Sequence, residues 1–131
     1  MSDQVVPFLM FEGQAEEAMR FYVSLFPEAR VLEIARYGKG AAGAEGTVSR
    51  ARFSIGGQTL MCTDSTVKQA FEFTPATSLF VQCTSKQRMR VLVDRLSEGG
   101  TVYMPLADYG FSKQFAWIAD RFGMSWQLNM G

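Results

Sequence analysis

The sequence predicts an α+β fold built from two consecutive βαβββ modules, on two observations. First, an apolar strand-like run, Val5–Phe11, breaks at Glu12-Gly13 and is followed by a segment with helical periodicity. Second, the same order of elements begins again at Thr77. A strand and a helix that are each apolar on one side must bury those sides against one another and against a larger sheet. The apolar positions of the first helix are Ala15, Ala18, Met19, Tyr22 and Phe26.

Three further strands are predicted after this helix. Val31–Tyr37 has the composition of a strand, and Gly38–Gly46 is a loop with four glycines. Thr47–Ile55 alternates between apolar and polar residues, which is typical of a half-buried strand. Gly56-Gly57 then marks a hairpin, and Gln58–Thr63 is the last strand of the module.

The second module repeats this order. Ser78–Cys83 is predicted as a strand, Thr84–Gln87 has the pattern of a capping box at a helix start, and Gly99-Gly100 ends the helix. The apolar stripe of that helix is Met89, Leu92, Val93 and Leu96. The strands predicted to follow it are Thr101–Leu106, Gln114–Ala119 and Ser125–Met130.

The two modules align at a spacing of 70 residues, which places Pro7 on Thr77 and Met19 on Met89. Near the end the spacing drifts, and Thr59 falls on Gln127. Few residues are identical, so the repeat rests on pattern and element order. Duplication of one unit and two unrelated halves of similar order both agree with this pattern. Either way we expect one domain over residues 1–131, with modules at about 5–63 and 77–131 joined by a connector at 64–76.

Composition excludes several classes of protein. The chain has 131 residues, 47% of them apolar, which suffices for one hydrophobic core. Lys plus Arg and Asp plus Glu number 13 each, so the basic excess typical of a nucleic-acid binder is absent. No apolar run approaches the ~20 residues of a membrane span, and the first residues lack the basic segment of a signal peptide. We therefore expect a cytoplasmic protein without membrane or nucleic-acid partners.

Cys62 and Cys83 both lie in apolar runs, which is typical of buried reduced thiols. A nucleophilic cysteine or serine would need a basic partner, and the chain has no histidine. The run Gly38–Gly43 fits G-x-G-x-x-G, but a β-like stretch follows it where a dinucleotide site needs a helix. We therefore expect no nucleotide-type cofactor.

Three segments carry a resemblance to a known family: PFLMFEGQAEEAMRFYVSLFP near the start, the IGGQTLM hairpin, and DRFGMSWQL near the end. Together they resemble the PhnB-like branch of the vicinal oxygen chelate superfamily, which includes glyoxalases, ring-cleaving dioxygenases and drug-resistance proteins. That branch often carries a 3-demethylubiquinone methyltransferase label. The resemblance implies a glyoxalase-like fold, in which two curved mixed sheets, each packed on its helix, enclose a cleft. It also implies a homodimer, and Phe71 and Phe73 on the connector are apolar residues that a partner surface would cover.

The resemblance also implies where a metal would bind, namely near the start and on the last strand of each module. Those positions here are Pro7, Thr59, Thr77 and Gln127. Proline and threonine are not credible ligands for a transition metal, so we expect a metal-free cleft. A hard-cation site remains an alternative, and its candidate carboxylates are Glu12, Asp64, Asp108 and Asp120.

Strand alternation then predicts which residues line the cleft. If the four positions above face it, then so do Leu9, Phe11, Met61, Thr63, Leu79 and Asn129. The helix-facing set is then Phe8, Met10, Leu60, Cys62, Phe80, Trp126 and Leu128. On the third strand Ala51, Phe53 and Ile55 take the helix side, which leaves Arg50 and Arg52 for the cleft or its rim. These two arginines are either solvated or an anion clamp. Phe115 and Trp117 share a face and either pack in the core or wall an aromatic pocket.

Two classes of function stay open at this point. The first is a small-molecule binding protein whose cleft is lined by Leu9, Phe11, Arg50, Arg52, Thr59, Met61, Thr77, Leu79 and Gln127. The second is an enzyme of the superfamily that acts on a small substrate. The absence of histidine favours the first.

Overall fold

The computed structural model describes residues 2–131, and they divide into two compact units whose boundary falls between Ala70 and Phe71. The first unit contains β1 (Phe8–Phe11), α1 (Ala15–Leu25), β2 (Arg30–Arg36), β3 (Val48–Ile55) and β4 (Gln58–Asp64). The second contains β5 (Ser78–Gln82), α2 (Lys86–Ser97), β6 (Thr101–Ala107), β7 (Gln114–Ala119) and β8 (Ser125–Met130). The predicted α+β class and the two βαβββ modules are confirmed.

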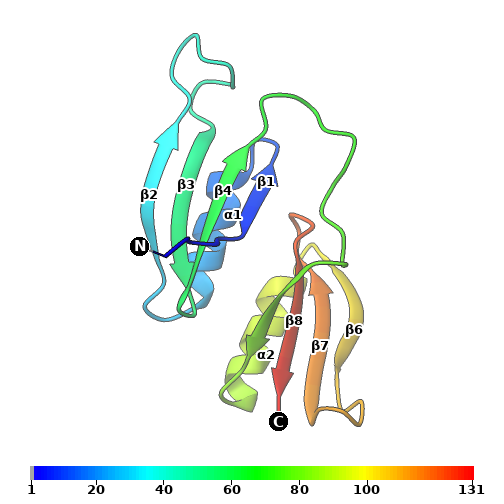
Figure 1. Cartoon of the computed structure of the whole chain (residues 1–131). Coiled ribbons are helices and arrows are strands. Elements are labelled where there is room, and N and C mark those ends of the chain that lie inside the picture. Colours follow the sequence, from blue (N-terminus) through cyan, green and yellow to red (C-terminus); the bar gives the residue numbers. More distant parts are fainter. Residues whose placement is uncertain (1) are drawn as a thin grey trace. The chain divides into compact units, whose positions relative to one another are not determined.

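Each unit is a four-stranded mixed sheet with its helix across one face (Figure 1). The strand orders are β1-β4-β3-β2 and β5-β8-β7-β6, so the two sheets have the same topology. The first strand of each module runs parallel to the last, and the remaining neighbours are antiparallel. The helix provides the crossover that a parallel pair requires. The other face of each sheet, which the unit's own helix does not cover, is called the open face below.

The helix-covered face of each sheet is apolar. The buried side chains of α1 are Ala15, Ala18, Met19, Tyr22 and Leu25. Leu25, not the predicted Phe26, completes the stripe. The ring of Tyr22 lies 6.4 Å from that of Phe53 on β3, centroid to centroid. In α2 the buried residues are Met89, Leu92 and Leu96.

The start of α2 differs by one residue from the prediction. Ser85 is the N-cap, and its Oγ accepts a hydrogen bond from the Arg88 backbone N–H at 3.1 Å, so the predicted cap at Thr84 is wrong. The helix ends at Ser97, and Gly99 with a φ of 72° lets the chain turn there, as predicted.

The carboxylate of Asp64 accepts hydrogen bonds from three separate segments of the first unit's backbone near the start of α1. Its Oδ1 accepts hydrogen bonds from the backbone N–H groups of Gly13 and Ala15, at 2.8 and 2.9 Å, and its Oδ2 accepts one from Val48 at 2.9 Å. The carboxylate therefore joins β4, the helix N-terminus and the start of β3, where unpaired N–H groups favour negative charge. Asp64 is 2% exposed and is the last residue of β4, whereas the sequence placed it at the start of the connector.

Asp120 has a similar role in the hairpin between β7 and β8. Its Oδ1 accepts from the backbone N–H groups of Phe122 and Met124, and its Oδ2 accepts from Trp126 Nε1 at 2.9 Å. This carboxylate is also buried, at 3% exposed. Both aspartates are engaged by protein donors that satisfy their buried oxygens.

The glycine-rich loop between β2 and β3 is closed at its base. Tyr37 donates its backbone N–H to Thr47 O at 2.8 Å and accepts from Gly46 N at 2.9 Å. A Cβ on Gly43 would stand 2.4 Å from the ring of Tyr37, so the loop backbone lies directly on that ring. The loop thus joins two antiparallel strands, as predicted, and does not open a helix.

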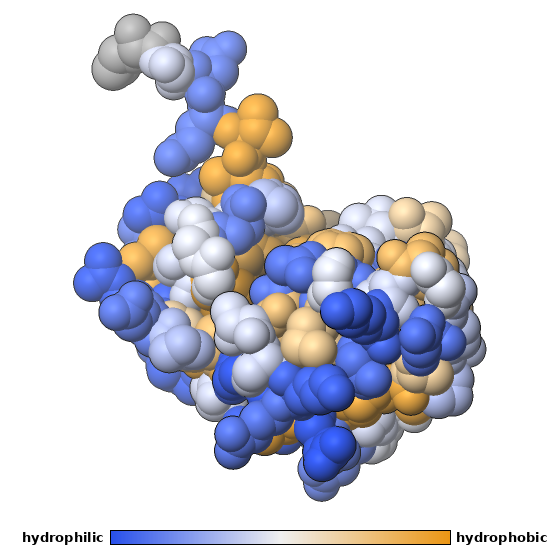
Figure 2. Space-filling view, turned by 90° about the horizontal axis from the view of Figure 1, so that it is seen from below, coloured by the Kyte–Doolittle hydropathy of each residue, from blue (hydrophilic) through white to orange (hydrophobic). Residues whose placement is uncertain are grey.

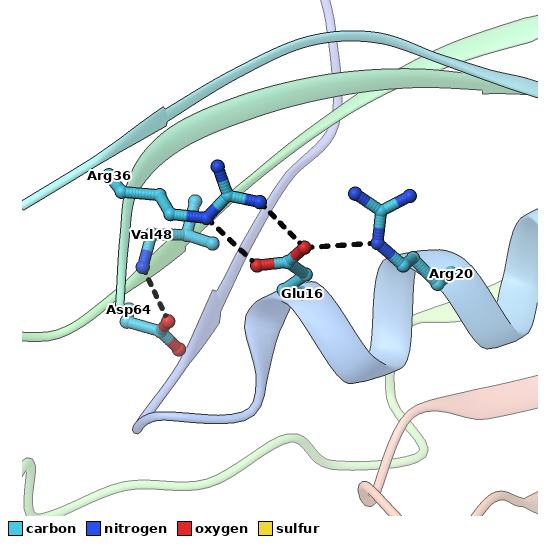
Figure 3. A network of polar contacts seen from close by, with 5 residues as sticks. All are labelled: Glu16, Arg20, Arg36, Val48 and Asp64. Carbon is cyan, nitrogen blue, oxygen red and sulfur yellow. Dashed lines mark hydrogen bonds and ion pairs between the residues drawn. The ribbon is translucent and has the colours of Figure 1, made fainter. Parts of the chain in front are cut away.

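An ion-pair network ties α1 to β2 on the surface. Glu16 binds Arg36 through two hydrogen bonds, of 3.1 and 2.8 Å, and Arg20 through one of 3.0 Å (Figure 3). The hydrogen bond from Arg36 is the main reason that the pKa of Glu16 lies below its ordinary value.

Hydrophilic and hydrophobic residues are interspersed over the side of the molecule that is seen in Figure 2. No helix within residues 2–131 has the length and apolar character needed to cross a membrane.

Replacing Asp64 with Asn should destabilise the protein by about 1.5–3 kcal/mol, because an amide nitrogen would then face a backbone N–H donor. Urea unfolding followed by circular dichroism measures this change. The matched control is Asp108→Asn, an exposed aspartate that accepts one local bond from Gly110 N, and its effect should stay within about 0.5 kcal/mol. Equal stability of the two variants would show that Asp64 does not have the structural role assigned to it.

The Glu16 network predicts a pH dependence with a defined sign. Because the folded-state pKa is lowered, the stabilisation is present above pH 4.5, the ordinary value, and is lost as the pH falls through the lowered pKa. In Arg36→Gln, the pKa of Glu16 measured by ¹³C NMR should rise toward its ordinary value. Arg30→Gln on the same strand is the control and should leave it unchanged. A Glu16 pKa that is the same in wild type and Arg36→Gln would contradict the assignment.

Candidate ligand-binding site

The register of the parallel pair β1–β4 decides which side chains of β1 reach the open face. Leu9 lies opposite Cys62, and Phe11 lies opposite Asp64. Cys62 and Asp64 are buried on the face that α1 covers, and Leu9 and Phe11 are buried with them, at 7% and 4% exposed. The prediction that Leu9 and Phe11 line a cleft is therefore wrong.

Phe8 and Met10 occupy the open face of β1. Phe8 lies opposite Met61 and is 56% exposed, whereas the sequence analysis placed it under the helix. The prediction for Met10 is wrong in the same way. The run Phe-Leu-Met-Phe is apolar at every position, so alternation carries no information about its faces. The assignment relied on placing Pro7 on the same face as Thr59, and an error of one residue moves every side chain of a strand to the other face.

The same correction applies to β5. Leu79 lies opposite the buried Trp126, and Phe80 lies opposite Gln127. Leu79 therefore points to the α2 side, and Phe80, which is 59% exposed, is on the open face. Thr77 precedes β5 and has no place in its register.

The predicted faces of β3, β4 and β8 agree with the structure. On β3, Ala51, Phe53 and Ile55 are buried, and Arg52 pairs with Met61 of β4 on the open face. Thr59 and Met61 share that face, and Gln127 occupies it on β8 between the buried Trp126 and Leu128. Alternation predicts correctly which side chains of these strands face the helix, because their two faces differ in polarity.

The arginines of β3 do not form a simple pair of free cations. Arg52 Nε lies 3.1 Å from Glu33 Oε1 of β2, close enough for an ion pair. The contact lacks the alignment of a hydrogen bond, and Arg52 Nε has no hydrogen-bond partner within residues 2–131. Arg50 lies opposite Ala35 and is exposed. An anion at this face could form an ion pair with the exposed Arg50. At Arg52 it would compete with the carboxylate of Glu33.

The open face of the second unit carries an aromatic cluster. The rings of Trp117 and Tyr103 lie 5.4 Å apart, centroid to centroid. Further along the same face, Phe115 packs against Phe111 at 5.0 Å and against Tyr109 at 6.2 Å. Tyr103 and Phe111 remain 44% and 68% exposed. Phe115 is 6% exposed and so packs in the core, which is one of the two interpretations kept open, whereas Trp117 is only partly buried.

A chain of hydrogen bonds runs beside this cluster. Trp117 Nε1 donates to Ser125 Oγ at 2.8 Å, and the hydroxyls of Ser125 and Ser78 are 2.6 Å apart. Gln127 Nε2 approaches Ser78 Oγ at 3.4 Å. Sequence reasoning missed Ser78 and Ser125, because they are 47 residues apart and only the β5–β8 register brings them together.

The register also corrects the alignment of the two modules. Met10 corresponds to Phe80 at the spacing of 70, and their parallel partners are Thr63 and Gln127. Thr63, not Thr59, is therefore the counterpart of Gln127. These open-face positions offer a thioether, a phenyl ring, a hydroxyl and an amide, which do not fit a transition-metal site. Within residues 2–131, no three His, Cys, Asp or Glu side chains come together as metal ligands would.

Cys62 lies on β4, and Cys83 directly follows β5. Cys62 and Cys83 are both buried and unpaired by disulfide, as predicted. Burial, with a smaller contribution from Asp64, raises the pKa of Cys62 to about 12. Burial also raises the pKa of Cys83. Neither thiol is a ready nucleophile.

Two βαβββ modules with this sheet order define a glyoxalase-like fold. FosX, a fosfomycin resistance protein from Listeria monocytogenes, has the same fold, with a TM-score of 0.70 over 100% of this chain and 94% of that one. The two sequences are 12% identical, so this likeness concerns the fold alone.

Within this fold, the chain belongs to the family described as 3-demethylubiquinone-9 3-methyltransferase, whose profile matches residues 3–129. The PhnB protein from Bacillus cereus is 46% identical, with a TM-score of 0.96 over 98% of this chain and 100% of that one. Protein PA1353 from Pseudomonas aeruginosa is 28% identical, with a TM-score of 0.85 over 98% of both chains. No curated protein matches the chain.

The raised pKa of Cys62 predicts that this thiol resists alkylation. At pH 8 iodoacetamide should leave Cys62 unmodified in the native protein, because the thiolate that reacts is scarce and buried. The same reagent in guanidinium chloride is the control and should modify both cysteines. Mass spectrometry of tryptic peptides distinguishes the two sites. Modification of native Cys62 at the rate of a small-molecule thiol would overturn its placement.

Proposed function

We propose that this protein binds a small, flat organic molecule on the open face of the second unit's sheet. The observation that carries the proposal is the aromatic cluster around Trp117, which remains partly exposed beside a row of polar side chains. Small-molecule sites combine apolar and aromatic walls with a few fixed polar groups. Trp117 and the serines supply both elements on neighbouring strands.

The hydrogen bond from Trp117 Nε1 to Ser125 supports this proposal, because it holds the indole in one orientation. A fixed ring offers contact area without a large loss of side-chain freedom on binding. Phe80 and Tyr103 lie on strands at the two edges of this sheet, and both are more than two-fifths exposed. Exposed aromatic side chains that share one face are typical of a binding surface.

The family description names a methyltransferase, but the proposal concerns binding and not methyl transfer. The glycine-rich loop Gly38–Gly46 connects β2 to β3 and packs on Tyr37, so it does not present a helix N-terminus to a nucleotide-type cofactor. The anion clamp of Arg50 and Arg52, the cleft lined also by the first unit, and the homodimer all remain predictions from the sequence.

A screen of flat aromatic compounds against ¹⁵N-labelled protein tests this function. Compounds that bind should shift the indole N–H signal of Trp117. The indole of Trp126 donates to Asp120 in the core and should not move, which makes it an internal control.

Replacing Trp117 with Ala should weaken binding by at least about 5-fold, because each stacked ring contributes roughly 1 kcal/mol or more. The matched control is Phe71→Ala, an exposed aromatic residue outside every strand, and its affinity should equal that of wild type. A screen in which bound compounds leave the Trp117 signal unmoved would contradict the proposed site.

A further inference from the structure

We infer that Ser78 is a hydrogen-bond donor to the bound molecule, and that the ligand is a planar conjugated carbonyl compound. This inference rests on the proposed function, since it concerns the same face. Its basis is a count of protons in the chain that links Trp117, Ser125, Ser78 and Gln127.

The two serine hydroxyls carry two protons, and the contact of 2.6 Å between their oxygens uses one. Trp117 Nε1 and Gln127 Nε2 are donors only, so they cannot accept the other. Among residues 2–131, the side-chain hydrogen bonds of the two hydroxyls are these three, and none of them runs from a hydroxyl to an acceptor outside the pair. One proton of the pair therefore remains available, whichever serine donates to the other.

The difference in burial between the two serines decides which hydroxyl donates its proton to a partner outside the pair. Ser125 is 1% exposed, whereas Ser78 is partly exposed on the edge strand β5. A buried hydroxyl that donated to nothing would lose a hydrogen bond without compensation by solvent. The favoured order is therefore Trp117 N–H to Ser125, Ser125 O–H to Ser78, and Ser78 O–H outward. Each hydroxyl that accepts a bond becomes a stronger donor, so the chain polarises its last proton.

The two neighbouring features then define the ligand class. Ser78 requires an acceptor atom, and the indole of Trp117 and the phenyl ring of Phe80 favour a flat conjugated group beside that atom. A carbonyl oxygen attached to an aromatic or conjugated system provides both. No positive charge belongs to this group of residues, so a formal negative charge on the ligand is not needed here.

Acetophenone and α-methylstyrene are a matched pair of probes, because they differ by replacement of the carbonyl oxygen with a methylene group. NMR titration, followed at the Trp117 indole, gives the affinity of each. The ratio of the two affinities, acetophenone over α-methylstyrene, should be roughly 3- to 10-fold higher in wild type than in Ser78→Ala, the value of one net hydrogen bond. Ser78→Thr, which keeps the hydroxyl, should retain the wild-type ratio.

The control variant is Ser97→Ala, a serine of α2 whose hydroxyl bonds to Asp94 O within the helix, and it should keep the wild-type preference. If both probes bind but the ratio of their affinities is the same in wild type and Ser78→Ala, the inference fails while the proposed function stands. If neither probe moves the Trp117 signal, both fail. Retention of the preference in Ser78→Ala with loss in Ser97→Ala would also overturn the inference.

Discussion

The parallel pairing of the first and last strand in each module is the constraint on which the rest of the structure depends. In β1–β4 and β5–β8, the register decides which side chains meet the helix and which lie on the open face. A shift of one residue would expose Leu9 and Phe11 and bury Phe8 and Met10. The same register brings Ser78 beside Ser125 and Phe80 beside Gln127. In each module this register therefore sets which residues form the core. In the second module it also sets which residues form the candidate site.

Two buried aspartates stabilise the turns that this pairing needs. Asp64 connects the end of β4 to the start of α1 and to β3, so the parallel strand and its crossover helix are joined by one carboxylate. Asp120 shapes the β7–β8 hairpin and holds Trp126 in the core through the indole N–H. Because Trp126 is next to Gln127, this bond also supports the neighbouring open-face position. Structural carboxylates thus occupy places where the sequence analysis considered cation ligands.

Sequence reasoning predicted the elements well and the site less well, for a physical reason. Strands such as β3, whose faces differ in polarity, reveal their orientation through alternation. The strand Phe8–Phe11 is apolar at every position, on the face that packs on α1 and on the open face alike, so its orientation follows only from pairing. The roles of Asp64 and Ser78 depend on partners 49 and 47 residues away. Trp117 could be recognised as a candidate from its strand position, but its bond to Ser125 could not.

Phe80, not Leu79, shares the open face with Gln127, and proton–proton contacts in solution measure this directly. A nuclear Overhauser spectrum of the unmodified protein should show contacts between the ring protons of Phe80 and the side chain of Gln127. It should also show the methyl groups of Leu79 near the indole of Trp126, since those two residues are opposite each other across the buried face. Contacts from Leu79 methyl groups to Gln127, with none from Phe80, would mean that the register is shifted by one residue and that the site described here does not exist.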